Sequence, residues 1–476
     1  MRYWCLAVAA VVAIGCGGES SAARYNRGED QVEDGAADRV GGTAGADTPA
    51  VPWTPVLQAA ADGEVAFALD LYARLAAAEK GNVFVSPYSI HAALALTAFG
   101  ADGATRDQLV KALRLPPGDD GPTAAGDLGR YYARPRPDFT LAVANAVWGQ
   151  ADYPWRAEWK EAAEARFGGG FRAADFKARP ADERARINTW VSEQTRTRIP
   201  DLLQPPHVSD RTRLVLTNAV YFDGKWTDAF PKGATRPQPF TTPTGKVQAP
   251  LMTVESHFRY AEGDGVQVVE LPYRGNELSM LVILPAAGEA KLTPEKLAGW
   301  DKKLARELVS VTLPKFKHTL RAEPLRHLRD MGVVDALSPA TADFGRMLGA
   351  KLDEPIYVAN VVHQAFVDVT EEGTEAAAAT AVINNAPSPA PPRPKVFRAD
   401  RPFTYLIRDT RKGTILFLGL LAVEGLDASV PGTWVGAMVP VARAFKPVKI
   451  LVPRAGRPAR PVGATGPRGV FGPLVW

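Results

Sequence analysis

TEEGTEAAAATAVI, residues 370–383, is the most informative stretch of this 476-residue sequence. Its run of alanines is compatible with a helix, because alanine favours that state. With the period of two of a strand, one face carries only small or uncharged side chains. The residues on that face are Thr374, Ala376, Ala378, Thr380 and Val382. Such a segment could enter a sheet as an additional strand without burying a charge, with Gly373 as the pivot.

The sequence around this segment predicts helices first and strands later. Apolar residues at helical spacing from Val65 to Leu75 indicate one helix, and Ser86-Pro87 with Ser89 begins a second that runs to Phe99. Strand signals then dominate at 139–148, 213–222, 266–271, 278–284, 308–313, 365–369, 403–407 and 414–418. A further helix is expected over 181–195. The mixture predicts an α+β fold with large, mostly antiparallel or mixed sheets.

The segment 370–383 closely resembles the proximal hinge of inhibitory serpins. Four other stretches resemble this family in the same order along the chain. They are NVFVSPYSI at 82–90, LTNAVYFDGKW at 216–226, VVHQAFV at 361–367, and FRADRPF at 397–403 with ILFLG at 415–419. The resemblance implies a serpin domain over 54–423, with about nine helices around three β-sheets and an exposed reactive-centre loop.

The resemblance also implies a function. In serpins a protease cleaves the exposed loop, and the cleaved loop enters the main sheet before the acyl-enzyme is hydrolysed, a known case of strand addition. We therefore expect a suicide inhibitor of a serine-type endopeptidase. The alternatives are a non-inhibitory serpin that acts as a binding or structural protein, and an inhibitor of a cysteine protease.

Motif positions carry the family's functional residues onto this chain. The hinge comprises Glu371, Glu372, Gly373, Thr374, Glu375, Ala376, Ala377, Ala378, Ala379 and Thr380. The polar shutter cluster, which holds the central strands together and must part on insertion, comprises Ser86, Ser89, Asn218 and His363. Trp226 matches the breach position where the loop enters the sheet. An ordinary buried polar set and core packing are the simpler interpretations of these residues.

The position of the reactive bond stays open at this point. The family's usual spacing from Gly373 places it at Pro387-Ser388, whereas counting back from residues 401–403 places it near Pro391. Bonds followed by proline resist most proteases. The remaining candidates include Val382-Ile383, Asn384-Asn385, Asn385-Ala386, Pro387-Ser388 and Pro389-Ala390. Small neutral residues favour an elastase- or subtilisin-like target over a trypsin-like one, and Asn385 leaves an asparagine-specific cysteine protease open.

No signature of a catalyst is present in the sequence. It has no GxSxG, no GxxxxGK[ST], no GxGxxG after a strand, and its only cysteines are Cys5 and Cys16. Six histidines include no HExxH pair. We therefore expect no enzyme activity, no cofactor and no metal site. The net charge of +4 is near neutral and aromatic-basic interleaving is missing, so we also expect no nucleic-acid partner.

The two ends of the chain have their own compositions. The chain begins with Met1-Arg2 and an apolar run over 3–14, followed by small residues before Cys16. This pattern predicts a signal peptide over 1–15 with a bacterial lipobox that is lipidated at Cys16, and ordinary signal cleavage is the alternative. Residues 16–53 predict a flexible acidic linker. Residues 424–476 are basic and rich in proline and glycine, which is typical of a disordered extension. We expect a monomer that is exported and either anchored to a bacterial membrane or released outside the cell.

Overall fold

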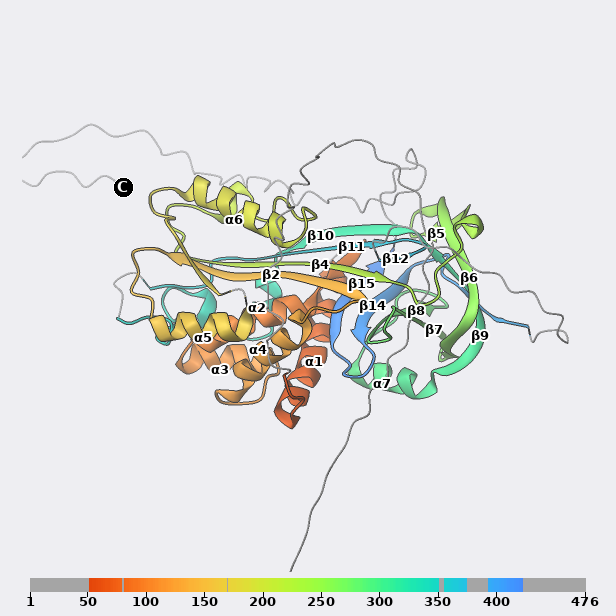
Figure 1. Ribbon diagram of the computed structural model, residues 1–476, viewed down its shortest axis with the longest axis horizontal. Coiled ribbons are helices and arrows are strands. Elements are labelled where there is room, and N and C mark those ends of the chain that lie inside the picture. The colour runs from red at the N-terminus through yellow and green to blue at the C-terminus, as the bar shows by residue number, and fades with distance from the viewer. Residues whose placement is uncertain (1–50, 79–80, 169, 351–354, 375–392, 423–476) are drawn as a thin grey trace, which may run out of the picture. The chain divides into compact units, whose positions relative to one another are not determined.

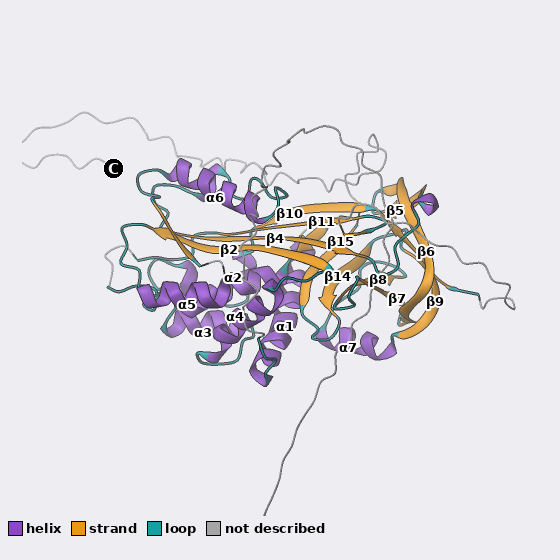
Figure 2. Cartoon of the chain, viewed as in Figure 1, coloured by secondary structure: helices purple, strands orange, loops and turns teal. Residues whose placement is uncertain are grey.

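The computed structural model of this chain describes residues 51–78, 81–168, 170–350, 355–374 and 393–422. Helices and two hydrogen-bonded sheets build this part of the chain (Figure 1; Figure 2). The α-helices of the described residues are α1 (Pro55–Ala78), α2 (Pro87–Gly100), α3 (Gly103–Ala112), α4 (Asp120–Ala133), α5 (Ala157–Phe167), α6 (Pro180–Gln194), α7 (Pro294–Lys303) and α8 (Leu325–Asp330). Short 3-10 turns are η1 (Pro205–His207), η2 (Lys232–Ala234) and η3 (Asp335–Leu337).

A six-stranded mixed sheet lies at the centre of the fold. Its order is β10 (Phe316–Ala322), β11 (Val361–Val369), β12 (Gly373–Thr374), β4 (Leu214–Lys225), β2 (Phe139–Gln150) and β3 (Phe171–Ala174). The strands β4 and β11 also pair directly with each other in parallel, from Val361 with Leu216 to Phe366 with Tyr221. The two-residue strand β12 lies between them at one end only.

A second sheet has nine strands. Its order is β1 (Val83–Val85), β15 (Ile415–Leu421), β14 (Phe403–Asp409), β8 (Leu278–Pro285), β7 (Val266–Pro272), β6 (Gly245–Gly263), β9 (Ala305–Pro314) and β13 (Lys395–Arg398), with β5 (Arg236–Thr242) paired to β6. The long strand β6 pairs with β5 over residues 245–251 and with β9 over residues 251–260. Its last five residues, 259–263, pair with β7.

The α+β class expected from the sequence is confirmed, with small differences in number. In the described ranges there are eight α-helices and two sheets, where about nine and three were expected. The sheet count differs because β6 is hydrogen-bonded on both sides and joins two groups of strands into one sheet. Each predicted strand is present with bounds that differ by a few residues; for example, the one expected at 365–369 begins at Val361.

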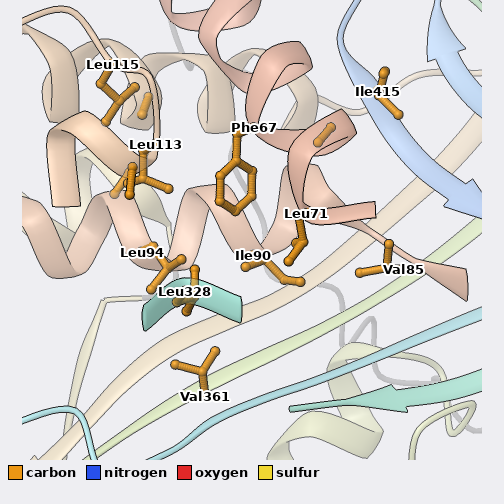
Figure 3. Packing of buried hydrophobic residues seen from close by; sticks show 14 of the residues in the cluster. Phe67, Leu71, Val85, Ile90, Leu94, Leu113, Leu115, Leu328, Val361 and Ile415 are labelled. Atoms are coloured by element: carbon orange, nitrogen blue, oxygen red, sulfur yellow. The ribbon is translucent and has the colours of Figure 1, made fainter. Parts of the chain in front are cut away.

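Helices pack on both faces of the six-stranded sheet. In Figure 1, α6 lies on one side of β2, β4 and β11, and α2 lies on the other with α1, α3, α4 and α5 around it. Phe67 of α1 and Ile90 and Leu94 of α2 are almost completely buried in the core that joins these helices (Figure 3). Full burial of such a side chain contributes about 1.5 to 3 kcal/mol.

The helix α2 begins where the sequence predicts. Pro87 occupies its first turn, and the Ser86 side chain accepts a hydrogen bond from the Ser89 backbone N–H at 3.2 Å. The helix is buried on almost all sides and packs near β4 and β15. The cap therefore places two serine side chains against the strands of the central sheet, at the position where the candidate site lies.

Candidate functional site

The site is the seam between β4 and β11, which is closed along most of its length and open at one end. At the open end Thr374 of β12 pairs with Val369 of β11 and with Gly224 of β4, both in antiparallel register. Gly373 pairs with Lys225 in the same register. The first two residues of the alternating segment are thus already a strand within the sheet.

Gly373 and Thr374 fit this position for different reasons. A Cβ atom on residue 373 would lie 2.2 Å from the Gly224 carbonyl oxygen, so only glycine allows the two backbones to approach this closely. Thr374 is fully buried, and its hydroxyl lies 2.8 Å from the hydroxyl of Tyr273. The uncharged face expected from the sequence therefore begins inside the fold at Thr374.

Trp226 lies beside the point where the chain turns into β12. Its indole stacks on Tyr273 with ring centroids 4.5 Å apart, and its Nε1 donates to the Thr370 carbonyl oxygen at 3.0 Å. The backbone N–H groups of Trp226 and Phe230 donate to the carbonyls of Glu372 and Glu371 at 3.0 and 2.8 Å. The turn is thus held by backbone hydrogen bonds on the side of β4.

The two glutamates of the turn are held by lysines. Lys315 lies 2.9 Å from Glu371, whose other oxygen accepts from the Thr235 hydroxyl at 2.8 Å. Lys232 lies 2.5 Å from Glu372. Burial opposes the charge of Glu371, but hydrogen bonds from Lys315, from its own backbone N–H and from Thr235 outweigh burial and hold the pKa of this carboxyl below its usual value.

A buried polar cluster closes the middle of the seam. The His363 side chain of β11 contacts the Asn218 amide oxygen of β4 through Nδ1, and its Nε2 accepts from the Ser86 backbone N–H at 3.0 Å. The Asn218 amide donates to the Ser89 hydroxyl at 2.6 Å and to Asn145 of β2 at 2.7 Å. Parting β4 from β11 would break the His363–Asn218 contact.

The cluster is electrically neutral near pH 7. Burial of the imidazole lowers the pKa of His363 from 6.5 to about 3. Since Nε2 accepts the Ser86 hydrogen bond, the ring proton belongs on Nδ1, where it is donated to Asn218. The neutral ring thus joins α2 to both strands of the seam without burying a charge.

The sequence-predicted residues fall into two groups. The structure brings Ser86, Ser89, Asn218 and His363 together, and it places Trp226 against the turn that precedes β12. It describes the hinge from Glu371 to Thr374. Outside the described residues lie Glu375, Ala376, Ala377, Ala378, Ala379 and Thr380, the reactive-bond candidates 382–391, Cys16, and the segments 1–50 and 423–476.

Other residues of the site were not anticipated from the sequence. Asn145 and Tyr273 complete the contacts of the cluster and of Thr374, and Lys232, Thr235 and Lys315 hold the glutamates. No local sequence signal marks Tyr273, Lys232, Thr235 or Lys315, because each acts through a partner that is distant in the chain. A polar Asn145 within the apolar strand 139–148 is the one hint that the sequence offers.

Neither a metal site nor a spanning helix is found in what the structure describes. Across these ranges no three His, Cys, Asp or Glu side chains are grouped so that they could hold a metal ion. The helices described also lack the combination of length and apolar character that crossing a membrane requires.

In this fold the six-stranded sheet already contains, as β12, the first residues of the hinge segment that follows β11. Residues 62–423 match the family Serpin (serine protease inhibitor). The chain belongs to the serpin family. This family is described by inhibition of proteases rather than by catalysis.

Individual relatives agree with this assignment. An uncharacterized serpin-like protein of Thermococcus kodakarensis is 39% identical over 362 residues, which is 74% of this chain and 83% of that relative. The leukocyte elastase inhibitor of Equus caballus is 37% identical over 74% of this chain and 96% of its own length. Among solved structures, tengpin, a thermophilic serpin in the native state, is similar with a TM-score of 0.68 and 27% identity, over 78% of this chain and 95% of tengpin. Proteins named as protease inhibitors are therefore among the relatives.

Proposed function

We propose that this protein is a suicide inhibitor of a serine-type endopeptidase, acting through cleavage of its reactive-centre loop and insertion of that loop between β4 and β11. The observation that carries the proposal is β12, in which Thr374 already pairs with both strands and Gly373 pairs with β4. Growth of a strand from an existing pair avoids the cost of starting a new one, which favours fast insertion after cleavage.

The registers of β12 support the same proposal. The pairs Val369–Thr374 and Gly224–Thr374 fix how a longer strand would align on each side. Continued without a slip, both registers bring Thr380 opposite His363 of β11 and opposite Asn218 of β4, which are themselves register partners. A threonine hydroxyl would then replace the contact that insertion breaks, so a buried polar group would not be left without a partner.

The sequence of the loop supports an elastase- or subtilisin-like target, because its candidate bonds join small neutral residues. One relative is named as an inhibitor of leukocyte elastase. A cysteine protease with asparagine specificity is the alternative that Asn385 leaves open.

The test is a protease panel. The purified protein is incubated with an elastase, a subtilisin, a trypsin and a papain-like protease, followed by denaturing gels and the mass of the released carboxy-terminal fragment. We expect an SDS-stable complex with an elastase or a subtilisin, and a fragment mass that locates the bond. Cleavage by these proteases without any complex, in a chain that gains stability once cleaved, would instead support a non-inhibitory serpin.

We also propose that the chain is exported and attached to a membrane by lipid on Cys16, and that it acts as a monomer with one protease per molecule. Support comes from the apolar run at 3–14 and the small residues before Cys16. Expression in a bacterium with labelled fatty acid tests this, because a Cys16→Ser variant should lose both the label and the membrane fraction.

A further inference from the structure

Glu64 is a buried acid that the proposed mechanism does not use. It lies in α1 and is 0% exposed. One carboxyl oxygen, Oε2, accepts a hydrogen bond from the Ile415 backbone N–H at 3.0 Å, and the other, Oε1, has no hydrogen-bond partner. The hydroxyl of Thr414, the residue before Ile415, is buried and makes no hydrogen bond to Oε1. A carboxylate in this position would have lost its water without gaining a cation.

Tyr88 on α2 is the ionisable group that lies close enough to Glu64 for their charges to interact in the described chain. The other ionisable groups on the neighbouring elements are engaged elsewhere; they are His91 on α2, Tyr132 on α4, Arg136 after α4 and Asp409 at the end of β14. Tyr132 donates to Asp409 at 3.0 Å, His91 bonds the Leu113 carbonyl, and Arg136 pairs with Glu277 at 2.8 Å. From α7, α8 and the rest of the described chain, no cation forms an ion pair with Glu64.

The electrostatics of the site therefore favour the neutral acid. Burial raises the pKa of Glu64 from 4.5 to about 8, against the smaller opposing effect of the Ile415 hydrogen bond. With the proton on Oε1, Oε2 remains free to accept from Ile415. At neutral pH the α1–β15 contact is thus made without a buried charge.

Four hydrogen bonds, together with the peptide bond between Ile415 and Leu416, connect Glu64 to the seam. The first joins Glu64 to Ile415, and in the second the Leu416 carbonyl accepts from the Ser86 hydroxyl at 2.6 Å. The Ser86 backbone N–H donates to His363 at 3.0 Å, and His363 contacts Asn218 across the seam. A shift of β15 at Ile415 would therefore move the serine that orients His363.

We propose that Glu64 is a proton-bearing carboxylic acid that acts as an alkaline pH sensor, whose ionisation loosens the start of β15 and, through Ser86, weakens the His363–Asn218 contact that closes the β4–β11 seam. An ionised carboxylate draws water towards it, and water reaches this position only if α1 and β15 separate. The importance of the seam for loop insertion rests on the proposed function. The chemistry of Glu64 does not.

The first test follows unfolding by denaturant from pH 5 to pH 9.5 for the wild type, Glu64→Gln and the control Glu158→Gln, in the exposed first turn of α5. The pKa of Glu64 is 4.5 in the unfolded chain and about 8 in the folded one. Between these pH values the ratio of the unfolding constant of the wild type to that of Glu64→Gln should rise by up to tenfold for each pH unit. The ratio should level off above about pH 8. Parallel curves for the wild type and Glu64→Gln would overturn the proposal.

The second test examines the folded protein. Hydrogen exchange of β4 and β11, corrected for the intrinsic effect of pH, should accelerate above about pH 8 in the wild type and in Glu158→Gln but not in Glu64→Gln. Unchanged exchange in the wild type would overturn the link to the seam. If Glu64→Gln fails to fold, infrared spectra of the wild type suffice, because the band of a protonated carboxyl group should be present at pH 7 and vanish by pH 9.5. No protease is needed, so failure here is distinguishable from failure of the proposed function.

Discussion

Replacement of Thr374 by arginine should convert the inhibitor into a substrate. Thr374 is fully buried between β4 and β11 and bonds Tyr273. A guanidinium at this position would be a buried charge without a partner, and such a charge costs at least about 3 kcal/mol. Because residue 374 already lies in the sheet, the arginine would expel β12, and its cost would then be met again when the loop inserts. Added to the barrier to insertion, this cost lowers the rate of insertion roughly 100-fold. If the wild-type loop inserts about tenfold faster than the acyl-enzyme is hydrolysed, the loop of the variant would insert about tenfold slower than hydrolysis.

The assay is the stoichiometry of inhibition, the number of inhibitor molecules consumed for each protease molecule trapped. Thr374→Arg should give cleaved chain and active protease, with almost no SDS-stable complex. Thr374→Ser keeps the hydroxyl and should inhibit, and Thr244→Arg adds the same charge at an exposed turn between β5 and β6 without effect. An unchanged stoichiometry for Thr374→Arg would refute the argument that the site accepts only uncharged side chains.

Three further predictions concern the same seam. Gly373→Ala should displace β12 from the sheet, because the new Cβ would lie 2.2 Å from a carbonyl oxygen of β4. Limited proteolysis should then cut the hinge faster than in the wild type, and equal rates of cleavage would contradict this. Trp226→Phe removes the 3.0 Å hydrogen bond to Thr370 but keeps an aromatic ring, so we expect a loss of about 1 kcal/mol in denaturant unfolding, and no loss would show that the bond contributes little. Burial lowers the pKa of His363 to about 3, so the stability that its neutral ring contributes is complete above pH 6.5 and is lost as the pH falls towards 3. The stability of a His363→Gln variant should therefore depend less on pH in this range than that of the wild type. An identical pH dependence would count against a neutral ring.

The sequence predicts the fold best where local signals and tertiary packing agree. The cap at Ser86 and Pro87 marks the start of α2, and the apolar run at 278–284 marks β8. It predicts β6 poorly, because the buried residues between Gly245 and Gly263 are unevenly spaced and do not follow the regular alternation of a strand. The joining of two groups of strands by β6 depends on pairs between distant segments, and no local signal contains them.

For the site, the sequence identifies residues that are recognisable by their position within a family segment. Trp226 and His363 are such residues, and their burial and partners follow only from the structure. Lys315 and Tyr273 could not be predicted, since a lysine at the end of a strand and a tyrosine after another are ordinary in sequence. Their roles arise from the turn that brings Glu371 and Thr374 to them.

The pairing of Gly373 and Thr374 in β12 also limits how the gene can change in length. Side chains alternate between the faces of a strand, so removing or adding one codon just after Thr374 would exchange the two faces of everything inserted behind it. After an addition, the charge of Glu375 would face the core together with Ala377 and Ala379, and Thr380 would face away from it. Length can therefore vary freely only farther along, in the proline-rich run before Lys395, so natural variants of this chain should differ in length there and remain constant between Gly373 and Val382.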